Sequence, residues 1–452
     1  MSKPLPCLLF AALTLGCSQS QPAPATGGPN VPATAAVSTP PVAEATPAAK
    51  PASPRVATRK PGATIAYADE LADWDRKIAA SIKRAEAQPT SLIAAEAVAG
   101  SYLTRARLSG SYDDYASAQL WVDKGFQCDP SGRNGPFGTR ASLNFTLHRL
   151  DRVDGDFADA QRGKHDNITE SGHKLFAANL ALQRGDLKAA GPLFDASIAL
   201  HPSVGNLSAK AYYVLGMGRP DEAEALYRQA LDMYHGATRE PAAWLHLQLG
   251  LLDLGRGRWD DALAHYRDAE AKLSGYWLID EHIAEILTLQ GKTDEAMALY
   301  LDIIARTDNP EFMDAVAGIL LAQDKADEAK VYIERADARF RVLSARYPEA
   351  AYGHALDHYL EFGDDLAHVV ELAEKNHALR PNPDAKQRLA QAYRKAGRID
   401  DAKRVIMQAL ASGWTTADLH AEAAEVLRAA GDTKAADAEL AKARAIDPHA
   451  GA

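Results

Sequence analysis

Paired glycine and alanine residues recur along this chain at a nearly constant interval. In six places a glycine stands five residues before an alanine, and successive copies on either side of one gap are 33 to 39 residues apart. A unit of this size cannot bury its apolar face alone, so the period predicts units that stack into an array. The six pairs are Gly185 with Ala190, Gly218 with Ala223, Gly257 with Ala262, Gly291 with Ala296, Gly397 with Ala402, and Gly431 with Ala436.

The composition favours helices throughout the repeated part. From about Thr64 onward the commonest residues are the strong helix formers Ala, Leu, Glu, Lys and Arg, and aromatic residues make up only 7% of the chain. We therefore expect an all-α fold, an α-solenoid of stacked antiparallel helix pairs.

Charge limits the partners that such an array can have. The chain carries a net charge of −10, to which Lys3 contributes +1 and residues 18–62 contribute +3, so residues 63–452 carry −14. An acidic body repels the phosphates of nucleic acids and anionic membranes, so we expect no nucleic-acid partner.

The amino terminus resembles a bacterial lipoprotein signal. Lys3 precedes a short apolar run, Leu5 to Leu15, and the run ends at Gly16-Cys17. The resemblance implies cleavage before Cys17 and lipidation of its thiol. It therefore implies a protein of the bacterial cell envelope, with Ser18 favouring the outer membrane, facing the periplasm. Ordinary secretion with cleavage elsewhere and an uncleaved anchor are the alternatives.

These features divide the chain into four segments. Residues 1–17 form the signal, and residues 18–62, rich in Pro, Ala and Thr and without an aromatic residue, form a disordered tether. Residues 63–170 are expected to hold an N-terminal cap helix and degenerate helical repeats. Residues 171–452 are expected to hold the regular array.

The repeats resemble the tetratricopeptide repeat, a helix–turn–helix unit of about 34 residues. In residues 243–275, Gly250 lies in a first helix, Gly257 in the turn, and Ala262, Tyr266 and Ala269 on one face of a second helix. The small residues let two helix backbones approach, and Tyr266 fills the space beside them. The family implies that the first helix of each pair lines a concave surface that holds a peptide or a helix of a partner protein.

Two copies depart from the pattern. Asp324 stands where a turn glycine is expected, and Val369 replaces the small residue of the second helix. The interval from Ala329 to Val369 is 40 residues, so residues 335–350 are expected to extend a helix or a loop. Residues 131–170 are expected to be helical, without an assignable register.

Polar residues on the first helices mark a candidate binding groove. Glu281 and Glu285 share one helix face, and equivalent faces carry Asp314, Gln387 and Gln391. This pattern predicts a partly acidic surface for a protein or peptide partner. Paired carboxylates also serve in glycosidases, but a solvated helix face explains their spacing more simply.

His354 and His358 are the strongest candidates for chemistry. Two histidines four residues apart on a helix can chelate zinc, but the sequence fixes no third ligand. We therefore expect them to contact the partner, with metal binding as the alternative, and we expect no cofactor.

The sequence as a whole predicts a binding protein. It contains no P-loop, GxGxxG, HExxH or GxSxG motif, so we expect no enzyme. The expected function is that of an envelope-anchored scaffold or adaptor, held to the membrane through a lipid at Cys17. An assembly or secretion accessory, such as a pilotin-like or biogenesis factor, is the first alternative. A metal protein or enzyme using the His354/His358 region is the second.

Overall fold

Helices account for the regular structure of this protein. The computed structural model describes residues 66–236 and 238–451, and within them there are α-helices and one 3-10 turn but no strand. The all-α prediction is therefore confirmed for the described residues, none of whose helices is long and apolar enough to cross a membrane. The signal at 1–17, its Cys17 and the tether at 18–62 lie outside the described residues.

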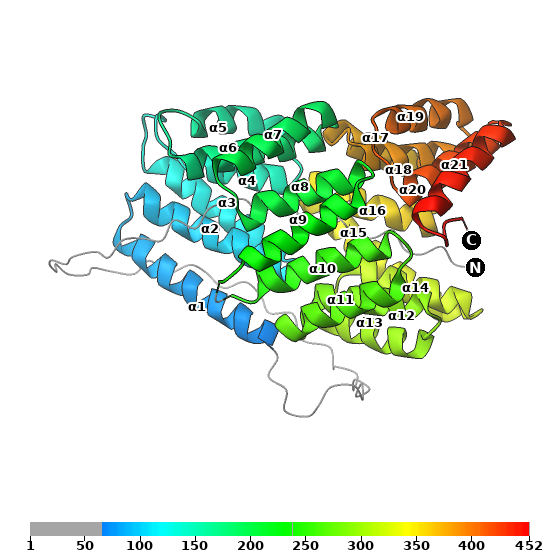
Figure 1. Cartoon of the computed structure of the whole chain (residues 1–452). Coiled ribbons are helices and arrows are strands. Elements are labelled where there is room, and N and C mark those ends of the chain that lie inside the picture. The colour runs from blue at the N-terminus through cyan, green and yellow to red at the C-terminus, as the bar shows by residue number, and fades with distance from the viewer. Residues whose placement is uncertain (1–65, 237, 452) are drawn as a thin grey trace.

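The helices follow one another as antiparallel pairs along the chain (Figure 1). In the part of the chain that the structure describes, a single helix, α1, precedes ten pairs that run from α2 with α3 to α20 with α21. The bounds are α1 Ala66–Ala87, α2 Leu92–Ser109, α3 Tyr112–Gln127, α4 Phe137–Thr146, η1 Leu150–Arg152, α5 Val153–Ala160, α6 Asn167–Gln183, α7 Leu187–Leu200, α8 Val204–Gly216, α9 Pro220–Met233, α10 Glu240–Leu254, α11 Trp259–Lys272, α12 Trp277–Leu289, α13 Thr293–Thr307, α14 Pro310–Ala322, α15 Ala326–Arg346, α16 Pro348–Phe362, α17 Leu366–Leu379, α18 Pro383–Lys395, α19 Ile399–Ala411, α20 Ala417–Ala429 and α21 Thr433–Ile446.

The recurring glycines end the first helix of a pair in the left-handed conformation. All six have φ between 68° and 79°, a region that residues with a Cβ seldom adopt. Asp324, which stands in the glycine's place, takes the same conformation with φ 59°. This helix pair therefore keeps the left-handed turn although it lacks the turn glycine.

The recurring alanines lie where two helices of a pair touch. All six are completely buried. In the pair α10–α11, a Cβ placed on Gly250 would come within 2.2 Å of the Tyr266 ring, and that ring is itself fully buried. The absence of a side chain at Gly250 therefore makes room for the tyrosine, as the sequence predicted.

The two irregular stretches resolve into helices of unusual length. Helix α15 spans 21 residues, so the extension expected at residues 335–350 is largely a continuation of the second helix up to Arg346. Residues 131–170, which had no register, hold the short helices α4 and α5, joined by η1.

Distant parts of the chain meet because the array winds into a tight superhelix. Figure 1 shows the first turns of α1, in dark blue, beside the light-green helices around α11. There the Tyr67 N–H donates to the Ser274 carbonyl at 3.2 Å. Further contacts join Trp277 Nε1 to the Leu108 carbonyl at 3.2 Å, the Tyr347 hydroxyl to the Tyr112 carbonyl at 2.9 Å, and the Thr415 N–H to the Gly216 carbonyl at 2.7 Å. Successive turns therefore touch and enclose an interior.

Substitution of two equivalent glycines tests the packing at the small-residue positions. Gly250→Ala should lower the free energy of unfolding by about 1–3 kcal/mol, because the new methyl group clashes with the Tyr266 ring. Gly318→Ala is the matched control. It lies two periods further on in helix α14, where the nearest atom is 3.8 Å from the new Cβ, and should raise stability by about 0.5–1 kcal/mol. Chemical denaturation measures both, and equal effects would contradict this packing.

Candidate functional site

The interior of the superhelix contains a large cavity of about 1300 Å³. Twelve aromatic side chains line it, contributed by elements from α1 to α16. They are Tyr67, Trp74, Tyr112, Tyr115, Phe145, Phe176, Tyr234, Trp244, Tyr276, Trp277, Phe340 and Tyr347. Aromatic walls of this kind offer apolar area together with hydroxyl and indole donors, which suits the binding of protein side chains.

A smaller acidic pocket of about 70 Å³ adjoins this cavity. Glu311 and His354 line both, so they mark the junction. Seven carboxylates line the pocket, and we refer to it below as the acidic pocket. They are Glu281, Glu285, Glu311, Asp314, Asp357, Glu361 and Asp384.

The carboxylates of the acidic pocket lie on the first helices of four successive pairs. They come from α12, α14, α16 and α18, and none comes from the second helices between them. This agrees with the expectation that first helices line the concave side. Because each carboxylate is fixed to a packed helix, the charge of the pocket is held in place before any ligand arrives.

Glu281, His282 and Glu285 form a buried cluster on α12. All three side chains are less than a tenth exposed, and His282 Nδ1 lies 3.1 Å from Glu281 Oε2 and 3.2 Å from Glu285 Oε2. Burial raises the pKa of Glu281 to about 8, although the neighbouring imidazole opposes the shift. Burial lowers the pKa of His282, but the two carboxylates outweigh it and the net shift is upward. Glu281 and His282 therefore both keep their protons to higher pH than they would in water.

The two candidate histidines of α16 each bind a carboxylate of α14. His354 Nδ1 contacts Glu311, and His358 Nδ1 lies 2.8 Å from Asp314 Oδ1. Burial raises the pKa of Asp314 to about 6, with His358 acting in the opposite direction. Burial lowers the pKa of His354, but the charge of Glu311 outweighs it and raises the pKa overall. Since each Nδ1 already has a carboxylate partner, chelation through these atoms would have to break both contacts.

Two arginines stand on the far wall of the acidic pocket. Arg388 donates to both oxygens of Asp357, at 2.8 and 3.2 Å. Arg380 donates to Asn376 Oδ1 at 2.7 Å, and burial lowers its pKa to about 10. Burial also raises the pKa of Asp384, which lies in the field of both guanidinium groups. These arginines offset part of the negative charge and leave the opposite wall acidic.

The structure brings together five of the seven residues that the sequence singled out. Glu281, Glu285, Asp314, His354 and His358 all line the acidic pocket. Their role in partner binding stays a prediction.

The other two predicted residues do not line the acidic pocket, and their role in partner binding also stays a prediction. On α18 the wall is made by Asp384, Ala385 and Arg388, whereas Gln387 and Gln391 are half-buried elsewhere on the helix. Superhelical winding rotates each pair relative to the one before. The same repeat position therefore meets a different environment several units later.

Several residues of the site were missed from the sequence. Glu311, Asp357 and Arg388 reach the acidic pocket from positions that no repeat rule marks. His282 could have been found from the sequence, because a histidine next to Glu281 and one turn before Glu285 forms a compact titratable cluster on one helix.

Paired helices, left-handed turns and a concave interior lined by first helices define a helical-repeat solenoid. Residues 205–273, 247–310 and 383–412 match three family models described as tetratricopeptide repeat. These matches support a tetratricopeptide-repeat protein, with the matched units at α8 to α13 and at α18 and α19. Such repeats are generally non-catalytic protein-interaction modules, so the fold suggests a protein-interaction scaffold.

Solved structures of similar fold share little sequence with this chain. A tetratricopeptide repeat protein from Parabacteroides merdae is 17% identical, with 54% of this chain and 93% of that chain covered and a TM-score of 0.33. Yeast Tom70 is 15% identical, with coverage of 83% and 88% and a TM-score of 0.43. PilW, described as a type IV pilus biogenesis factor, is 16% identical, with coverage of 57% and 94% and a TM-score of 0.31. No curated protein matches the chain.

Replacing Glu281 by Gln should reduce the pH dependence of stability. The folded chain keeps the Glu281 proton to about pH 8, whereas the ordinary pKa of a glutamate is 4.5. The stability that this proton contributes is therefore fully present below pH 4.5 and is lost as the pH rises toward 8. As pH rises from about 5 to 8, the free energy of unfolding should fall by roughly 2–3 kcal/mol less in the variant than in the wild type.

Denaturation at a series of pH values measures this difference. Glu295→Gln, the same change at an exposed position of α13, is the control and should follow the wild-type curve. Parallel curves for Glu281→Gln and the wild type would show that Glu281 ionises normally.

Proposed function

We propose that this protein is a non-enzymatic, envelope-anchored scaffold that captures an extended, basic segment of a partner protein inside its superhelix. The observation that carries the proposal is the junction of the aromatic cavity with the acidic pocket at Glu311 and His354. A bound segment would lay apolar side chains along the aromatic walls and extend a lysine or arginine into the acidic pocket.

The charge of the acidic pocket favours a cationic ligand group. Seven carboxylates stand against two arginines and two histidines, so the net charge is −3 when all of these groups are ionised. It is less negative while Glu281 keeps its proton, but it remains negative. A cation there favours the ionised form of Asp314, whose pKa is raised to about 6. Capture should therefore strengthen as pH rises through this value.

The size of the aromatic cavity favours a polypeptide over a small molecule. Sites for drug-sized ligands usually enclose about 300–1,000 Å³, and this cavity is larger, at about 1300 Å³. Aromatic side chains in a preformed groove are also the usual anchors in protein recognition.

Binding of paired peptide probes tests this function. A Lys/Arg-containing peptide with aliphatic flanks should bind, and the same peptide with Glu at the basic positions should not. Glu311→Gln and Asp314→Asn should each weaken binding about tenfold, because each removes one charge facing the ligand. Asp327→Asn on the exposed face of α15 is the matched control. Fluorescence anisotropy measures the affinities, and equal binding of both peptides would contradict the proposal.

Anchoring to the envelope rests on the sequence before the described residues. The apolar run that ends at Cys17 and the tether at 18–62 support a lipid at the chain's start and an array held away from the membrane. A single acyl chain binds a membrane only weakly, so stable attachment needs a second membrane signal or a second chain. Lipoprotein processing would supply more than one acyl chain.

Replacement of Cys17 by Ser should release the protein from membranes. The serine hydroxyl does not replace the thiol that would carry the lipid, so the variant should move from the membrane pellet to the soluble fraction. Fractionation of cells measures the distribution, with Cys128→Ser as the control that keeps the signal intact. A Cys17→Ser variant that stays in the pellet would refute the lipid anchor.

A further inference from the structure

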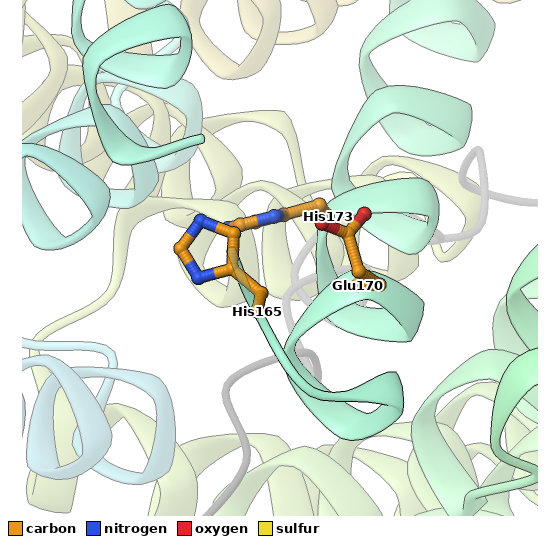
Figure 2. A group of neighbouring side chains, drawn as sticks. All are labelled: His165, Glu170 and His173. Carbon is orange, nitrogen blue, oxygen red and sulfur yellow. The ribbon is translucent and has the colours of Figure 1, made fainter. Parts of the chain in front are cut away.

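A second titratable cluster lies away from the cavity, where α5 leads into α6. Its members are His165, in the segment before α6, and Glu170 and His173, one turn apart on α6. Figure 2 shows the His165 ring facing His173, while Glu170 projects from the same helix. One ligand atom from each residue lies within 4.8 Å of those of the other two. The two imidazole rings meet edge to face, with centroids 4.8 Å apart.

Two ring nitrogens of this cluster are buried without a hydrogen-bond partner. They are His165 Nε2 and His173 Nδ1. Buried polar atoms are almost always paired, because an unpaired one keeps its desolvation penalty. Two such atoms on neighbouring rings are available to a shared ligand. Burial, followed by the charge of His165, lowers the pKa of His173.

The donor set suits a particular class of metal. Two imidazoles and one carboxylate are a common zinc set with three protein ligands, and they leave one coordination position for water. Calcium and magnesium prefer oxygen ligands, so this set disfavours them. Lys164 and Lys174 lie next to His165 and His173 in the chain and oppose a cation, whereas the Glu170 carboxylate favours it.

The other two clusters of this kind among the described residues also hold buried ring nitrogens without a hydrogen-bond partner, at His282 Nε2, His246 Nδ1 and His265 Nδ1. They differ from the cluster on α6 because their histidines already lie within ion-pair distance of carboxylates. In the Glu281 cluster, His282 Nδ1 already lies between two carboxylate oxygens. In the third cluster, His246 lies 3.8 Å from Asp268, and His265 lies 3.7 Å from Asp253, a carboxylate outside the cluster.

We propose that His165, Glu170 and His173 form a zinc site that fastens the segment before α6 to the first turns of that helix. The opposite face of α6, which carries Ser171, Leu175 and Phe176, lines the aromatic cavity. The metal would therefore stiffen a wall of the cavity from behind without contacting its ligand. The site is independent of the proposed peptide capture.

Titration of the purified full chain with Zn²⁺ tests this site, after chelator treatment and dialysis. Calorimetry should find one equivalent that binds the wild type. Affinity should fall at least about tenfold in His165→Gln, Glu170→Gln and His173→Gln, since each removes one of three ligands. His265→Gln, from the third cluster, is the matched control and should bind as the wild type does.

Two further measurements separate loss of ligand from loss of fold. Circular dichroism should be unchanged in the three variants, and bound Co²⁺ should give a tetrahedral ligand-field spectrum only in the wild type and the control. Protease cleavage between residues 161 and 166 should slow with Zn²⁺ in the wild type and not in His173→Gln. Equal Zn²⁺ affinity in the wild type and the His165 and His173 variants, or no Zn²⁺ bound by the wild type, would overturn the proposal.

Discussion

Close approach of helix backbones at small residues is the interaction on which the rest of this structure depends. The alanines that pack between paired helices have no exposed surface, and Gly250 leaves room for the ring of Tyr266. A single pair buried in this way still exposes an apolar face, so it is stable only against its neighbours. The spacing of helices, the winding of the array and the enclosed interior all follow from that contact.

Aromatic residues turn the open array into an enclosed one. Trp414 packs on Tyr212 with ring centroids 5.7 Å apart, and Trp259 stacks on His449 at 3.9 Å. Both contacts join residues about two hundred positions apart in the chain. The acidic pocket has a more local origin, because its lining comes from consecutive pairs between α12 and α18. The curvature of these pairs brings the carboxylates of α12 and the arginines of α17–α18 to the same pocket.

The repeat could be predicted from the sequence because it depends on neighbours in the chain. Gly257, Ala262 and Tyr266 lie within one helix pair, and local geometry fixes their roles. The candidate site could be predicted only in part. Glu281 and Glu285 were found because they share a helix face, whereas Arg388 reaches the same pocket through the curvature of the pairs between them. Gln387 does not line the pocket, since the repeat register contains no information about the rotation accumulated between units.

Two other features of the structure could not be predicted from local sequence patterns. The left-handed turn at Asp324 was concealed by the loss of its glycine, yet the surrounding helices impose the same backbone shape. The cluster of His165, Glu170 and His173 does not form a recognisable sequence motif, because His165 precedes the helix and the other two residues lie on it. Both cases show tertiary structure completing what a local pattern leaves undetermined.

Capture of a basic segment inside the superhelix is the central claim, and site-specific photo-crosslinking in the native cell tests it most directly. A benzophenone side chain at Trp74, on the wall of the aromatic cavity, reports on the interior. The same group at Val331, which is 62% exposed on α15, reports on the outer surface. We predict that Trp74 crosslinks to one partner segment containing lysine or arginine and that Val331 does not. Crosslinks from Val331 alone, or an interior crosslink to an acidic segment, would contradict the claim.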